Sequence, residues 1–231
     1  MIDLQGFGNL LLAGTLVTVE LSLAAMAVAV VLGLIGATAT RSRFAPARWL
    51  AAGYTTIVRG IPELLAILLV YFGASIVLMK IAGLFGYSGY IELSPFLAGT
   101  AALGFMYGAY ASEVVRGAID AIPYGQIEAA QAMGMHRLLV FRRIVLPQTW
   151  RLALPPLGNL FLALLKDTAL ISVIGANDLM RNTAIAVSQT KEAFTFYAAA
   201  ALIYLLLTVV TTAGITWLER NANRGMQRAR T

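Results

Sequence analysis

Long apolar stretches constrain this chain more than any other feature of its sequence. Segments at about 10–38, 52–79, 96–117, 152–175 and 195–218 are each long enough to cross a hydrocarbon core, which takes about 20 apolar residues. The 231 residues have a mean hydropathy of +0.79, and only 12% of them are charged, which is not typical of a soluble domain. The sequence therefore predicts an all-α integral membrane protein with five transmembrane helices in a single domain, 1–231.

Basic residues gather on alternate connections between these segments. The N-terminus and the connection 81–95 contain none, and the connection 176–194 contains only Arg181 and Lys191. The other connections and the tail are rich in arginine: Arg41, Arg43, Arg48, Arg137, Arg142, Arg143, Arg151, Arg220, Arg224, Arg228 and Arg230. By the positive-inside rule, this asymmetry predicts an odd number of crossings, with a periplasmic N-terminus and a cytoplasmic C-terminus. Topology thus accounts for the net charge of +6, and we expect no nucleic-acid partner.

Few residues are available for metal or nucleotide chemistry. The chain has no cysteine, and its single histidine, His136, has no companion ligands nearby in the sequence, so we expect no metal site. It also lacks the Gly-x-x-x-x-Gly-Lys-Ser/Thr loop that cradles nucleotide phosphates. We expect no cofactor on this chain.

The stretch EAAQAMGMHRLLVFRRIVLP, from Glu128 to Pro147, lies in the predicted cytoplasmic loop at about 118–151. A helix is expected to start at Pro123 and to end at Gly134 in the left-handed conformation. A second helix follows, and Pro147 is expected to interrupt it before the fourth span. Physical reasoning leaves two interpretations open. The small residues after Glu128 could fit a groove in another protein, or the basic helices could lie on anionic lipid headgroups.

The spacing within this stretch resembles the signature loop of the membrane subunits of bacterial binding-protein-dependent ABC importers. The seven matching positions are Glu128, Ala129, Ala130, Gly134, Ile144, Leu146 and Pro147. The resemblance implies that they form a coupling helix that docks into an ABC ATPase subunit, which binds ATP and Mg²⁺. It also implies the fold of a type I ABC importer transmembrane domain.

Three further stretches are similar to the polar amino acid permeases of histidine and arginine import systems, and most similar to the Q-type permease of arginine importers. They are VRGIPELLAILLVYFG (58–73), SPFLAGTAALGFMYGAYASEVVRGA (94–118) and LLKDTALISVIGANDLM (164–180). The resemblance implies a multi-pass subunit of the bacterial inner membrane that imports basic amino acids of the arginine, histidine and lysine/ornithine type and is not itself an enzyme. The implied partners are a second permease, either an M-type sister chain or a second copy, and a periplasmic or lipid-anchored amino acid-binding protein. The outer connections 81–95 and 176–194 are its expected landing surface.

Ionisable residues inside spans are candidates for function because they are costly to insert. Asp167 lies well inside the fourth span, and we hypothesise that it accepts a hydrogen bond from the cationic end of a basic amino acid. The alternative is a buried pair with Arg or Lys on another helix or subunit. Residues expected to share its face, a neighbouring stripe or the same pathway are Asn159, Ala163, Thr168, Ser172, Tyr107 and Tyr110.

A second group of residues is interpreted as structural or as part of a gate. Gly60 and Pro62 predict a break in the second span, beside Arg59 and Glu63. Glu113 and Arg116 are three residues apart on one helical face, so they are expected to pair.

Leu160 is a departure from the family pattern, because some relatives that handle basic solutes carry an acid there. Recognition of the cation would then depend on the soluble binding protein or on the partner permease.

Two rival functions remain open at this stage. An ion-gradient-driven secondary transporter or channel would use Glu20 or Asp167 as its ion or proton site. A membrane scaffold would only recruit an ATPase, and it would leave Asp167 without a purpose.

Overall fold

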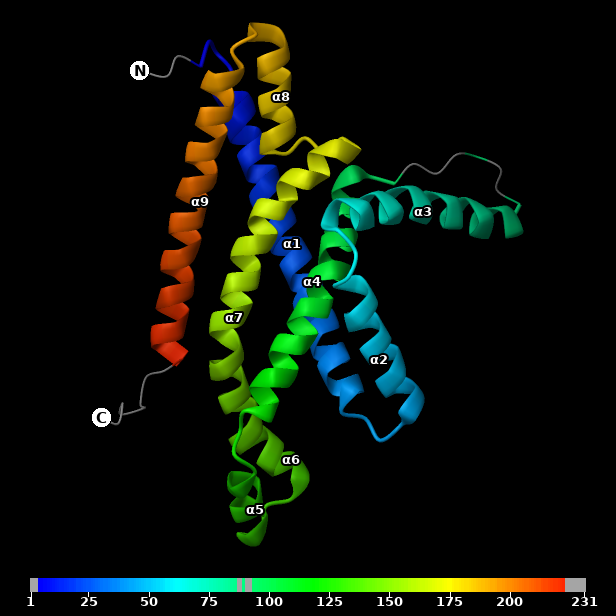
Figure 1. The fold of residues 1–231 in the computed structure, drawn as a ribbon, viewed down its shortest axis with the longest axis vertical. Coiled ribbons are helices and arrows are strands. Elements are labelled where there is room, and N and C mark those ends of the chain that lie inside the picture. Colours follow the sequence, from blue (N-terminus) through cyan, green and yellow to red (C-terminus); the bar gives the residue numbers. More distant parts are fainter. Residues whose placement is uncertain (1–3, 87–88, 90–92, 223–231) are drawn as a thin grey trace.

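The computed structural model describes residues 4–86, 89 and 93–222, and this part of the chain contains helices and connecting segments but no strand. Most of the helices run roughly along one long axis, and α3 lies across it (Figure 1). In chain order the elements are α1 (Gly8–Thr40), α2 (Ala45–Val58), α3 (Glu63–Leu84), α4 (Pro95–Asp120), α5 (Tyr124–Ala132), α6 (Arg137–Val140), the π-helix η1 (Phe141–Val145), α7 (Leu146–Asp167), the 3-10 helix η2 (Thr168–Ile174), α8 (Leu179–Thr190) and α9 (Ala193–Ala222).

The centre of the fold is the contact between α1 and α4, which pack along each other. Small side chains make this contact close. A Cβ atom added at Gly33 would lie 2.6 Å from the Cβ of Ala111, and one added at Gly36 would lie 2.5 Å from the Oγ of Ser112. Because small residues let helix backbones approach, van der Waals contact can hold the pair together in a membrane without a hydrophobic driving force.

Four helical segments of the described chain are long and apolar enough to cross a membrane: α1, α3, Arg137–Ile174 and α9. The sequence prediction of an all-α membrane protein agrees with these segments. Helix α4 is not one of the four, although its 26 residues would extend about 39 Å at 1.5 Å per residue. Its composition is less apolar because it includes Glu113, Arg116 and Asp120. Many of its other side chains, such as Ala98, Ala102 and Ala109, are buried against other helices.

The predicted second span, 52–79, is wrong as a single helix, but the predicted break at Gly60 and Pro62 is confirmed. Helix α2 ends at Val58, and α3 begins at Glu63, directly after Pro62. Proline has no N–H group and disfavours the helical conformation in the residue before it, so the hydrogen-bond ladder cannot continue. Helix α3 leaves the bundle sideways (Figure 1).

The fourth predicted span, 152–175, begins earlier than expected, and Pro147 does not interrupt it. Helical structure is continuous from Arg137 to Ile174 and passes through the π-helix η1, where the N–H of Leu146 donates to the carbonyl of Phe141 five residues earlier. Pro147 has no N–H, so the Arg143 carbonyl lacks the donor that an α-helix would supply. The helix accommodates this proline by widening instead of ending.

The connection 176–194 was predicted as an outer loop, but it contains helix α8. Asp178 caps this helix by accepting hydrogen bonds from the N–H groups of Met180 and Arg181. Helix α8 is attached to α1, because the Leu179 N–H donates to Thr18 at 3.1 Å and the Asn182 side chain donates to the Leu10 carbonyl at 2.9 Å. The other predicted outer connection, 81–95, lies partly outside the described residues, as do Arg224, Arg228 and Arg230.

Candidate coupling loop and substrate site

The segment from Pro123 to Gly134 forms the helix and turn that the sequence predicts. Helix α5 begins directly after Pro123, and Gly134 takes a positive φ of +79°, a conformation that favours glycine. Ala130 is buried, whereas Glu128 and Ala129 are exposed. This helix lies at the end of the molecule farthest from the N-terminus (Figure 1), so Glu128 and Ala129 are available to a partner.

A pair of glutamines joins α5 to the base of α7. The Gln148 side chain donates to the Oε1 of Gln126 at 2.7 Å and to the Ile144 carbonyl at 3.0 Å. Leu146 and Pro147 are exposed beside this contact. The two glutamines lie 22 residues apart, and the sequence carries no local signal that they meet.

Ion pairs connect the ends of α1 and α4 near the candidate coupling loop. The predicted pair of Glu113 and Arg116 is confirmed, with an N–O distance of 2.5 Å. Arg116 also pairs with Asp120 at 3.3 Å, and Asp120 pairs with Arg41. These side chains are 26 to 48% exposed, so water partly screens the attractions, and their main effect is to fix the geometry of this corner.

Asp167 lies where α7 changes into the 3-10 helix η2. Its Oδ2 atom accepts a hydrogen bond of 2.6 Å from the hydroxyl of Tyr107 on α4. Tyr107 is buried, and Asp167 is partly buried. The 3-10 helix η2 ends this helical segment at Ile174, and 3-10 turns are frequent at helix termini. The site therefore combines a carboxylate and a neighbouring hydroxyl at the point where α-helical geometry gives way to 3-10 geometry.

The carboxylate of Asp167 is in no salt bridge with the described residues. Within the part of the chain that the structure describes, Asp167 forms no ion pair. Lys166 is exposed, and adjacent helical residues point about 100° apart. Asp167 experiences the positive charge of Lys166 and the negative charge of Glu63. Its second oxygen remains available to a hydrogen-bond donor.

The other predicted pathway residues divide into two sets. Asn159 is exposed and Ala163 is partly buried on the same helix as Asp167. Thr168 and Ser172 donate their hydroxyl hydrogens to the carbonyls of Leu165 and Ala169, at 2.7 and 2.8 Å. Thr168 is fully buried and not open to a solute in this structure, whereas the partly buried Ser172 hydroxyl could act toward one only as an acceptor.

The predicted gate residue Arg59 lies next to the aromatic pair. Its guanidinium sits over the Tyr110 ring, 5.4 Å from the centroid, and the rings of Tyr107 and Tyr110 are 5.8 Å apart. A cation over an aromatic face is attracted to the ring quadrupole. Leu160 packs partly buried against the core.

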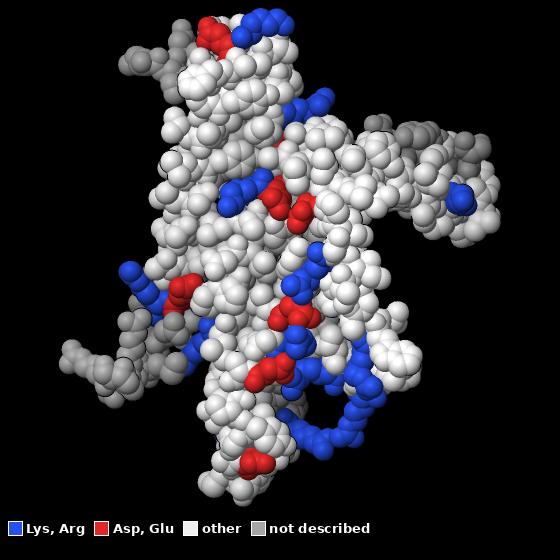
Figure 2. Space-filling view, viewed as in Figure 1, with Lys and Arg blue, Asp and Glu red and all other residues white. Residues whose placement is uncertain are grey.

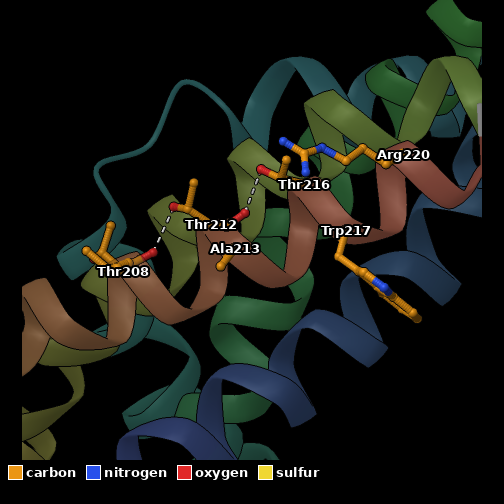
Figure 3. Close-up of a pocket in the computed structure, with 7 residues that line it drawn as sticks. Thr208, Thr212, Ala213, Thr216, Trp217 and Arg220 are labelled. Atoms are coloured by element: carbon orange, nitrogen blue, oxygen red, sulfur yellow. Dashed lines mark hydrogen bonds between the residues drawn. The ribbon is translucent and has the colours of Figure 1, made fainter.

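Helix α9 carries a separate groove of about 490 Å³, which Figure 3 shows in close-up. Thr208, Thr212 and Thr216 follow its axis, and each hydroxyl donates to the carbonyl four residues earlier at 2.7 to 2.8 Å. Such back-bonding satisfies a hydroxyl within its own helix. Arg220 and Trp217 lie at one end (Figure 3). This groove suits contact with apolar groups better than binding of a polar solute.

Comparison with known proteins decides the family. Residues 29–224 match the model of the binding-protein-dependent transport system inner membrane component. The chain belongs to this family. It is 45% identical over 224 residues to an octopine transport system permease protein from Rhizobium radiobacter, which covers 97% of this chain and 94% of the relative. It is 42% identical over 226 residues to a histidine/lysine/arginine/ornithine transport system permease protein from Escherichia coli strain K12, covering 98% and 99% of the two chains.

A solved structure agrees with these relatives. The crystal structure of an amino acid ABC transporter with histidines has a chain that is 33% identical to this one, with a TM-score of 0.80 and coverage of 92% and 94%. The family inferred from the Glu128 to Pro147 motif is confirmed. This chain is a permease subunit of an amino acid ABC importer and not an enzyme.

Proposed function

We propose that this permease forms half of the translocation pathway for basic amino acids and that Asp167 receives their cationic side chain. The observation that carries the proposal is the partly buried Asp167 carboxylate, held by Tyr107 at the junction of α7 and η2. Charge-assisted hydrogen bonds are stronger than neutral ones, and a guanidinium can bind a carboxylate through two of them. The relatives named for histidine, lysine, arginine and ornithine transport support this class of solute.

We infer five crossings of the bacterial inner membrane, with the N-terminus in the periplasm and the C-terminus in the cytoplasm. The arginine distribution supports this orientation. The arrangement in Figure 1 is consistent with it, because the start of α1 and helix α8 lie at one end of the molecule, whereas α5, α6 and the end of α9 lie toward the other. Helices α2 and α3 together would make the second crossing, and α4 the third.

We propose three partners for this chain. An ABC ATPase that carries ATP and Mg²⁺ would dock on the exposed side of α5. A second permease would cover α3, whose apolar side chains are largely exposed, including Leu69, Phe72 and Ile76. A periplasmic or lipid-anchored amino acid-binding protein would deliver the solute at the end that carries α8.

The mechanism is alternating access. Closure of the ATPases on ATP would pull α5, and the contact between Gln126 and Gln148 would carry the motion into α7. Asp167 lies at the other end of α7, where the change to 3-10 geometry gives the helix a place to bend. In this mechanism Glu113, Arg116 and Asp120 hold the cytoplasmic corner together while the pathway is closed on that side.

Uptake into proteoliposomes tests this function. The complex of this permease with its co-purifying ATPase and binding protein is supplied with labelled arginine, histidine or glutamine, with and without internal ATP. We expect ATP-dependent uptake that prefers arginine and histidine. Uptake that proceeds without ATP and collapses with an ionophore would favour the ion-gradient transporter instead. ATP-driven uptake that prefers glutamine would retain the importer and reject Asp167 as a cation site.

A further inference from the structure

We propose that Glu63 supplies a second carboxylate to the Asp167 site and helps to select cationic over neutral amino acids. This inference rests on the proposed function. It gives Glu63, which the sequence groups with structural residues, a role in specificity. It also supplies a counterpart for the acid that Leu160 replaces, from a different helix of the same chain.

The position of Glu63 follows from the packing of α3. Glu63 is the first residue of α3, and Ile67 stands one turn later on the same helical face. Ile67 is fully buried in the core cluster that also contains Tyr107 and Leu164. Helix α3 contacts both α4 and η2. The first turn of α3 is therefore directed toward the two elements that carry Tyr107 and Asp167.

The charges in this region agree with that placement. Glu63 acts electrostatically on both Tyr107 and Asp167. Acidic surface lies beside basic surface at the junction of α3 with the bundle (Figure 2). Glu63 is partly buried, so solvent screens its charge only in part.

No cation of the described chain forms an ion pair with either of these two acids. Neither Glu63 nor Asp167 forms an ion pair among residues 4–86, 89 and 93–222. Arg59 is placed over the Tyr110 ring. Two neighbouring carboxylates that are both charged repel each other, and a cation between them removes this repulsion. The pair therefore favours a positively charged solute over a neutral one of the same shape.

The hydrogen-bonding capacity of the site fits a guanidinium. Tyr107 occupies one oxygen of Asp167, which leaves the other oxygen and both oxygens of Glu63 as acceptors. A guanidinium presents five N–H donors in one plane, so it can contact both acids at once. A neutral urea group of similar shape carries fewer donors, has no charge and offers an acceptor that the carboxylates would repel.

Equilibrium binding of arginine and of citrulline, its neutral isostere, tests the inference. Titration calorimetry on the permease and ATPase complex without the binding protein removes the selectivity of that protein. For Glu63→Gln we expect the ratio of arginine affinity to citrulline affinity to fall about tenfold, which is 1.4 kcal/mol of discrimination. Glu63→Asp keeps the charge and should restore most of the ratio. Glu219→Gln makes the same chemical change on α9 and should leave the ratio unchanged.

The outcomes separate this inference from the proposed function. If Asp167→Asn lowers the ratio and Glu63→Gln does not, Glu63 has no role in selection, and the proposed function stands. If neither substitution changes the ratio, the cation site itself is wrong. A Glu63→Gln variant that loses affinity for arginine and citrulline equally would reveal a structural role and would overturn the inference.

Discussion

Helices α3 and α4 are both long enough to cross a membrane, but they differ in opposite ways from what hydropathy alone suggests. Helix α3 meets the hydropathy criterion for a span, yet only Ile67 and Ser75 are buried along its length. Helix α4 does not meet that criterion, yet it lies in the centre of the described fold and packs along α1. The amino-acid composition of a helix thus indicates what surrounds it. An apolar helix faces lipid or another subunit, whereas a helix enclosed by its own chain can consist of small and polar residues.

The largest expected effect comes from filling the contact between α1 and α4. A Cβ at Gly33 would lie 3.0 Å from the backbone carbon of Ala111, which cannot move without shifting α4. Gly33→Leu should therefore cost about 3 kcal/mol or more and greatly reduce the yield of folded permease in fluorescence-detected size-exclusion chromatography. Gly117→Leu on α4 is the matched control, because no atom lies within 4 Å of its added Cβ. Equal losses for both variants would show that close packing at Gly33 is not the cause.

Asp178, the buried residue that caps α8, carries a carboxyl group that responds to pH. Burial raises the pKa of Asp178 to about 6, against the opposing hydrogen bonds from the N–H groups of Arg181 and Met180. Between about pH 4 and pH 6, Asp178 therefore carries a proton in the folded state that it has already released in the unfolded state. The permease should gain about 2 kcal/mol of stability as the pH falls from 7 to 4.

Thermal unfolding at pH 7 and pH 4 measures this gain. Asp178→Asn keeps a helix-capping residue and should remove most of the difference between the two pH values. A difference that persists unchanged in the Asn variant would assign the pH response to another group.

The smallest expected effect concerns helix α3, of which only two residues are buried. A bulky apolar substitution is tolerated by fluid lipid but not by a packed protein interface, so Leu69→Trp distinguishes the two environments. If α3 covers a second permease, pairing should weaken about tenfold, or 1.4 kcal/mol, as measured by mass photometry of the purified subunits. Leu205→Trp on α9 is the control, because Leu205 is 59% exposed and Leu69 is 57% exposed. Unchanged pairing in both variants would place α3 against lipid.

Much of the fold could be predicted because apolar runs end where helices end. The predicted spans at 10–38, 96–117 and 195–218 lie within α1, α4 and α9. The break at Pro62 and the turn at Gly134 could also be predicted, because backbone chemistry is local. The direction of α3 could not, since a proline indicates where a helix stops but not the angle at which the next one leaves.

The candidate sites were less predictable because they depend on contacts between distant parts of the sequence. The Glu113 and Arg116 pair lies on one helix and could be inferred from spacing. Arg41 meets Asp120 from 79 residues away, and no local pattern marks that contact. The roles of Asp167 in the pathway and of Glu128 in coupling stay predictions, although the first is now tied to Tyr107 by a hydrogen bond.

The π-helix η1 has a consequence for the rotational orientation of α7. It lies between α6 and α7, and a π turn contains one residue more than an α turn closed by the ordinary hydrogen bond. Each residue of an α-helix turns the side-chain direction by about 100°. This single extra residue therefore sets the directions in which the side chains of α7 point. Conversion of η1 to α geometry would turn α7 about its own axis and would carry Asp167 away from Tyr107. The widened turn therefore sets the angle at which Asp167 faces Tyr107.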